Sequence, residues 1–200
     1  MTKKVILLAF VFCLSLNHSF SQDNDGGGYT GGLTKFLSWI SNIDNVLLGI
    51  DNKENLSALN RNLGYTILYI DEIATGKLLL AKEIADLKSD KDDDKHISSL
   101  SNRADEIVVS ITNLNSYLRK IKSLLSQTNQ KEIDSIVLEI EQGFQYRKLH
   151  LLKQIKEGLY KKNISYNEIL QDAQESKKIA DNALKEIKVA KEKIVAVLTK

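Results

Sequence analysis

The stretch ISSLSNRADEIVVSITNLNSYLRKIKSLL, residues 97–125, has the clearest pattern of the chain. After Ile97, its apolar residues recur at alternating steps of three and four: Leu100, Ala104, Ile107, Ile111, Leu114, Leu118, Ile121 and Leu125. Four heptads with this spacing place all of these side chains along one side of an α-helix, as in a helical bundle or a coiled coil. The stretch therefore predicts one long helix that packs against another.

The preceding segment, residues 53–88, has a similar stripe with eight apolar residues in ten positions. Its other two positions hold Thr66 and Lys77, and the apolar eight are Leu56, Leu59, Leu63, Ile70, Ile73, Leu80, Ile84 and Leu87. This spacing predicts an amphipathic helix about 50 Å long.

A shorter stripe occupies residues 33–50, where we expect one short helix. It consists of Leu33, Phe36, Leu37, Ile40, Ile43, Val46, Leu47 and Ile50. Trp39, the single tryptophan, falls beside the stripe. A tryptophan at the apolar edge of a helix favours a role in the core, and the alternative is an exposed partner surface.

Two more stripes follow, from Ile133 to Leu159 and from Ile169 to Val197. At residues 126–130, SQTNQ, the apolar phase slips by one residue, which permits a tight hairpin or a stutter inside one very long helix. We favour the hairpin. The absence of proline from all 200 residues also favours long helices. We predict an all-α protein in which residues 33–200 form one elongated antiparallel helical bundle or coiled coil of four long helices plus one short N-terminal helix.

The first residues have the pattern of a cleaved secretory signal peptide, which we assign to residues 1–21. Lys3 and Lys4 precede an apolar run over 5–16, and Ser19 and Ser21 stand at the −3 and −1 positions of the expected cleavage site. The apolar run is too short for a permanent membrane span. We expect an exported bacterial protein, periplasmic or extracellular.

Residues 22–32 contain five of the ten glycines and are expected to be a flexible leader. Because Cys13 would leave with the signal peptide, the mature chain would have no disulfide, thiolate ligand or cysteine nucleophile. Residues 23–146 hold 13 basic and 19 acidic side chains, whereas 147–200 hold 13 and 7. This balance favours solvated, mutually complementary faces and gives no reason to expect nucleic-acid binding.

The acidic stretch KSDKDDDKH, residues 88–96, resembles the start of a calcium loop. Asp90, Asp92 and Asp94 fit the first three ligand positions of an EF-hand. However, Lys95 stands where the loop needs glycine, and Ser101 stands where it needs a bidentate glutamate. We therefore predict a solvated turn between two helices rather than a calcium site.

The remaining chemistry-bearing residues do not converge. His96 and His150 lack the Glu-x-x-His spacing of di-iron bundles, and no zinc, phosphate-loop or serine-elbow motif occurs. We therefore expect no catalytic, cofactor-binding or metal-binding residues. Tyr65 and Tyr69 differ, because four-residue spacing places both on one helix face. For these two residues, as for Trp39, we favour packing in the core. The alternative is an exposed partner surface, for which Trp39, Tyr65 and Tyr69 are the candidate residues.

These observations favour a non-enzymatic helical protein that binds protein partners or its own copies. One alternative is a membrane-associating protein, with weak lipid contact through the apolar face of helix 33–50. The other is an enzyme or metal protein whose site no motif reveals.

A signal peptide that ends in FSQ looks like those of secreted Bacteroidetes proteins. The glycine-rich start, the helix GGLTKFLSWISNIDNVL and the long helices without cysteine are similar in organisation to periplasmic conjugal-transfer proteins of the minor-pilus type. The resemblance implies a helical bundle that binds other subunits of a secretion or conjugation assembly.

Overall fold

The structure is a computed structural model that describes residues 29–50, 52–86, 94–141 and 166–199. Every regular element within these ranges is an α-helix, so the prediction of an all-α protein is confirmed. The helices are α2 (Tyr29–Ser41), α3 (Ile43–Leu47), α4 (Lys53–Asp86), α5 (Asp94–Lys122), an unlabelled helix over 127–141, and α7 (Tyr166–Leu198).

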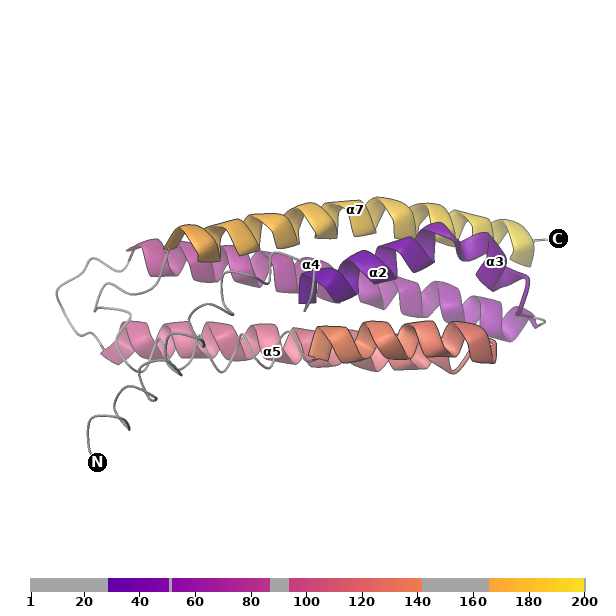
Figure 1. Ribbon diagram of the computed structural model, residues 1–200, viewed down its shortest axis with the longest axis horizontal. Coiled ribbons are helices and arrows are strands. Elements are labelled where there is room, and N and C mark those ends of the chain that lie inside the picture. The colour runs from indigo at the N-terminus through magenta and orange to yellow at the C-terminus, as the bar shows by residue number, and fades with distance from the viewer. Residues whose placement is uncertain (1–28, 51, 87–93, 142–165, 200) are drawn as a thin grey trace, which may run out of the picture.

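The long helices lie side by side along one axis, which gives the elongated outline in Figure 1. α4 packs against both α5 and α7. It runs antiparallel to α5, because Glu83 meets Arg103 while Glu72 meets Ser110 further along. α7 is likewise antiparallel to α4, since Lys53, at the start of α4, donates a hydrogen bond to the carbonyl oxygen of Leu198, at the end of α7. α4 is thus the common neighbour of two long helices.

The chain reverses at residues 123–126, so the hairpin is present but lies a few residues before the predicted 126–130, which is mostly helical. The ammonium of Lys122 lies 2.7 Å from a carboxylate oxygen of Asp134, and Arg119 forms an ion pair with Glu141. In one straight helix, residues 119 and 141 would stand about 33 Å apart. The stutter interpretation is therefore wrong.

The first helix differs from its prediction at both ends. α2 begins at Tyr29, inside the segment expected to be a flexible leader. The expected single helix is interrupted at Asn42, and α3 begins at the next residue. Gly32 explains the early start, because α2 lies so close to helix 127–141 that a Cβ atom at Gly32 would stand 3.2 Å from the carbonyl oxygen of Ile136. The glycine thus permits a close helix contact instead of loosening the chain.

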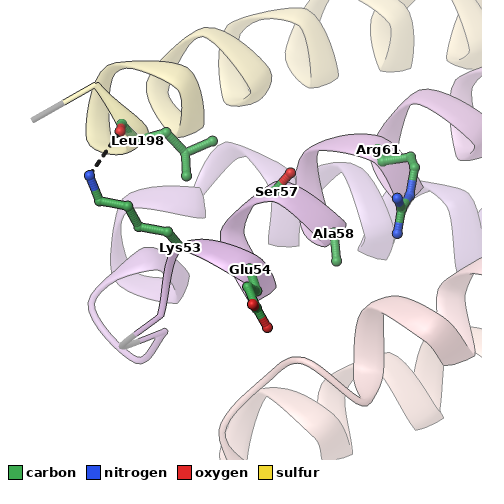
Figure 2. Close-up of a pocket in the computed structure, with 6 residues that line it drawn as sticks. All are labelled: Lys53, Glu54, Ser57, Ala58, Arg61 and Leu198. Atoms are coloured by element: carbon green, nitrogen blue, oxygen red, sulfur yellow. Dashed lines mark hydrogen bonds between the residues drawn. The ribbon is translucent and has the colours of Figure 1, made fainter.

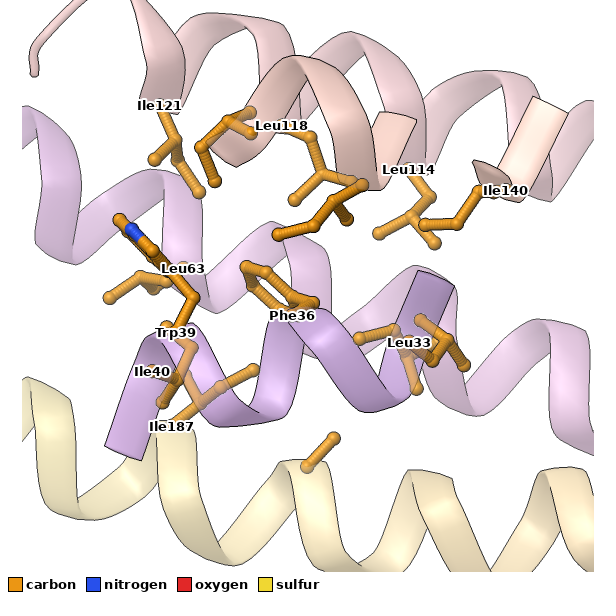
Figure 3. Packing of buried hydrophobic residues seen from close by; sticks show 14 of the residues in the cluster. Leu33, Phe36, Trp39, Ile40, Leu63, Leu114, Leu118, Ile121, Ile140 and Ile187 are labelled. Atoms are coloured by element: carbon orange, nitrogen blue, oxygen red, sulfur yellow. The ribbon is translucent and has the colours of Figure 1, made fainter. Parts of the chain in front are cut away.

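Within the described ranges, residues of the predicted stripes form most of the core. All eight positions from Leu100 to Leu125 are buried, and so are the described stripe positions of α4, Thr66 and Lys77 included. Figure 3 shows side chains of α2 between those of α5 on one side and Ile187 of α7 on the other. Val197 was expected in the stripe of α7 but is 40% exposed; Leu198 packs against the core at this end instead.

Candidate interaction surface

Trp39 belongs to the core, which agrees with the role that its place beside the stripe favours and leaves no partner surface at this residue. It is 5% exposed, and its ring stacks on Phe36 with centroids 5.9 Å apart. Figure 3 shows both rings among the side chains of neighbouring helices. Although Trp39 lies at the edge of the apolar stripe, neighbouring side chains cover the edge of α2 as well as its centre.

Tyr65 and Tyr69 do form a common face on α4, and the structure adds a third ring from α5. Tyr117 stacks on Tyr65 with centroids 4.6 Å apart and on Tyr69 with centroids 5.7 Å apart. Tyr65 remains 41% exposed, whereas Tyr69 and Tyr117 are half-buried. No pattern in the sequence points to Tyr117, since only the register between α4 and α5 brings it to the other two.

Charged neighbours and burial act on individual rings of this cluster. The Lys120 ammonium lies 4.0 Å from the centroid of the Tyr117 ring, a cation–π geometry. Burial raises the pKa of Tyr69 above its ordinary value of 10.0, and Tyr117 and Glu72 act in the same direction. The Tyr69 phenol is therefore neutral at physiological pH and can donate a hydrogen bond.

Two further exposed residues extend the same face of α4. Arg61, Tyr65 and Leu68 follow at helical spacing, and Leu68 is 49% exposed. We call Tyr65, Leu68, Tyr69 and Tyr117 the tyrosine surface. Tyrosine is enriched among the residues that dominate binding energy at protein interfaces. The tyrosine surface therefore has the composition of a protein-binding site.

A groove runs between α4 and α7, and it is lined by residues that do not belong to the tyrosine surface. Its volume is about 470 Å³, and it is lined by Asn60, Ile67, Leu184, Lys188, Lys191, Glu192 and Val195. We call it the α4–α7 groove. Its floor is apolar, and lysines stand along it.

A second hollow, of about 520 Å³, lies where α4 begins and α7 ends. In Figure 2, Lys53 donates a hydrogen bond of 3.2 Å to the carbonyl oxygen of Leu198, whereas Glu54 and Arg61 extend away from α7. The charged groups therefore diverge, and this hollow does not gather the acid, base and nucleophile that an active site needs.

One polar cluster lies inside the protein. The buried Lys77 ammonium is 2.9 Å from a carboxylate oxygen of Asp172 and 2.9 Å from the hydroxyl oxygen of Ser176. Both partners belong to α7, so these contacts connect the two helices through the interior. We assign the cluster a role in aligning α4 with α7.

The other site predictions have different outcomes. Within the described ranges, no three or more His, Cys, Asp or Glu side chains gather as a metal site would require, and no helix combines the length and apolarity that a membrane crossing needs. Most of KSDKDDDKH, and His150, lie outside the described residues. The apolar face of helix 33–50 is packed into the core at Phe36, Ile40 and Ile43, so this face is not free for lipid.

Comparison of the chain with models of protein families, with curated proteins and with solved structures found no match.

Proposed function

We propose that this protein is a non-enzymatic interaction protein that binds other protein subunits through the tyrosine surface. The observation that carries the proposal is the three-ring stack of Tyr65, Tyr69 and Tyr117, which stays partly open to solvent next to Leu68. Stacked rings lose little side-chain entropy on binding, because neighbouring rings already hold them in place. A partner would therefore meet a preorganised apolar surface.

The proposal includes a finer view of the fold, in which four long antiparallel helices and one short N-terminal helix form a single bundle. The antiparallel contacts of α4 with α5 and α7 support it. A long bundle is a rigid support for a surface formed by residues of two helices. This rigidity suits a structural subunit better than an enzyme that must close around a substrate.

We place the protein outside the cytoplasm, in the periplasm or beyond, as a subunit of an envelope-spanning secretion or conjugation assembly. The support is the signal-peptide pattern of residues 1–21 and the architectural resemblance to minor-pilus-type proteins.

Photo-crosslinking in the native host tests the interaction. A benzophenone amino acid replaces Leu68 in the full chain, and a matched control replaces Leu138, which is exposed to a similar extent on helix 127–141. We expect a discrete adduct from position 68 and none from position 138. The mass of the adduct distinguishes a second copy of this chain from another protein, and either result supports the proposal. No adduct at position 68, or equal adducts at both positions, would refute it.

A further inference from the structure

The α4–α7 groove is built along one row of α7. Leu184, Lys188, Lys191 and Val195 follow at steps of four, three and four, so they share one side of the helix. Leu184 and Val195 are 52% and 46% exposed. Eleven residues separate them, which corresponds to about 16 Å along the helix axis. The row therefore offers two apolar contacts three turns apart, with two lysines between them.

The lysines of α7 fall into two groups. Two are held by carboxylates of other helices, whereas Lys188 and Lys191 belong, with Lys178 and Lys185, to those for which the described residues provide no such partner. Lys177 and Lys193 are held by Asp71 and Asp44 of other helices. Lys188 and Lys191 have no ion-pair partner among the described residues, and Glu192 is the one carboxylate in the lining. The groove thus combines an apolar floor with an excess of positive charge that the fold does not neutralise.

Gly64 of α4 adds a second observation. A glycine inside a helix costs about 0.5–1 kcal/mol relative to alanine. A Cβ atom at Gly64 would meet only the Lys191 ammonium, at 3.0 Å, so no packing against backbone requires the glycine. The missing side chain leaves space beside Lys191.

We propose that the α4–α7 groove binds an acidic amphipathic helix of a partner protein. Its apolar residues contact Ile67, Leu184 and Val195, and its carboxylates pair with Lys188 and Lys191. A helix fits because the two apolar contacts lie three helical turns apart along a straight groove, as in other helix-in-groove complexes. The groove shares no residue with the tyrosine surface, so this proposal does not depend on that one.

A pair of designed peptides tests the charge preference. Both are labelled 18-residue helices with leucines on one face, and they carry either glutamates or lysines on the flanks. We measure their binding to the full chain by fluorescence anisotropy at low salt. The glutamate peptide should bind, at least tenfold more tightly than the lysine peptide, and added salt should weaken it. Equal binding of the two peptides, or no binding of the acidic one, overturns the proposal.

Charge-reversed variants locate the site. Lys188→Glu combined with Lys191→Glu should weaken the acidic peptide at least tenfold. The control, Lys178→Glu combined with Lys185→Glu, makes the same charge change at exposed positions of α7 outside the groove and should change binding less than threefold. Equal losses in the two double variants would mean general electrostatic attraction and would refute the site.

Gly64→Leu separates binding from folding. Leucine is the better helix former and meets only a flexible lysine end, so the melting temperature should hold or rise while the acidic peptide loses at least tenfold in affinity. A folded Gly64→Leu variant with unchanged affinity contradicts the proposal. Two other results would also contradict the proposal. The protein could bind phosphatidylglycerol vesicles through Lys188 and Lys191, or it could form a dimer in light scattering that the Lys188→Glu, Lys191→Glu variant abolishes.

Discussion

α5 and α7, the two long helices that pack against α4, bury side chains of different size in the core. α5 contributes large buried residues: Leu100, Ile107, Ile111, Leu114, Leu118 and Ile121. α7 contributes mostly small ones: Ala173, Ser176, Ala180, Ala183 and Ala190, together with Ile187 and Ile194. α4 therefore packs against one helix whose buried side chains are mostly large and another whose buried side chains are mostly small.

This difference shows two ways of holding a helix in a bundle. At the α4–α5 interface the stabilisation comes from apolar area removed from water, which is large but tolerant of many apolar shapes. At the α4–α7 interface, small residues leave room for the long Lys77 side chain to reach Asp172 and Ser176. A buried ion pair adds little net stability but disfavours other alignments of the two helices. We infer that α5 supplies most of the stability and α7 most of the register.

The largest effect should follow from removing volume at the α4–α5 interface. Leu118 is fully buried, so Leu118→Ala should lower the free energy of unfolding by about 2–5 kcal/mol. Urea unfolding followed by circular dichroism measures the change. Val109→Ala is the control, because Val109 is 58% exposed on the same helix and should change stability by no more than about 0.5 kcal/mol. Similar losses in both variants would show that α5 does not bury this face.

The next effect tests the ion pair at the α4–α7 interface. Lys77→Met removes the ammonium from the Asp172 carboxylate, which keeps 29% of its side chain exposed. Loss of one partner of a buried pair costs about 3–5 kcal/mol, and we expect the lower end because Asp172 can still reach water. A double-mutant cycle with Asp172→Asn checks the coupling. If the two changes are additive, the pair does not align the helices.

Ala183→Leu probes the small residues of α7 directly. Ala183 is buried, and a larger side chain there should force the helices apart at a cost of about 1–3 kcal/mol. The neighbouring exposed position gives the control, since Asn182→Leu introduces the same side chain into solvent and should be neutral or slightly stabilising. A tolerated leucine at position 183 would mean that the two helices are not closely packed there.

The sequence predicts the core of both interfaces because helical periodicity is a local property. Thr66 and Lys77 were placed correctly in the stripe of α4 although neither is apolar, since spacing alone determined their positions. Features that depend on the neighbouring helix were missed. Gly32 was expected in a flexible leader, yet its contact with helix 127–141 makes it part of α2.

The candidate surfaces show the same limit. Tyr65 and Tyr69 could be paired from their spacing within one helix, whereas Tyr117 could not. The sequence alone does not distinguish Lys188 and Lys191 from the other lysines of the basic C-terminal segment, because only the packing of α7 on α4 places these two along the α4–α7 groove. Contacts between two helices can be predicted only if their relative register is known. The apolar stripe of a single helix does not specify that register.

The smallest expected effect is a loss of stability at alkaline pH. One titrating residue at each interface contributes to it. At the α4–α7 interface, hydrogen bonds to Asp71 and Asp181 raise the pKa of Lys177 above its ordinary 10.5. At the α4–α5 interface, burial raises the pKa of Tyr69 above 10.0. In both cases the folded protein holds the proton more tightly than the unfolded chain. Their contributions are thus fully present below about pH 10 and are lost as the pH rises through the folded-state pKa values.

Stability should therefore decline above about pH 10, and each residue should account for part of the slope. Urea unfolding between pH 8 and 11 measures it, with Lys177→Met and Tyr69→Phe as the variants. Lys177→Met should flatten the decline, although both partners are largely exposed and solvent screening keeps the effect small. Tyr69→Phe should also remove a step with a midpoint above 10.0 from the tyrosine absorbance titration. A Tyr69 midpoint at or below 10.0 would show that its ring is not held in the stack, and the tyrosine surface would then lack the preorganisation on which its proposed binding rests.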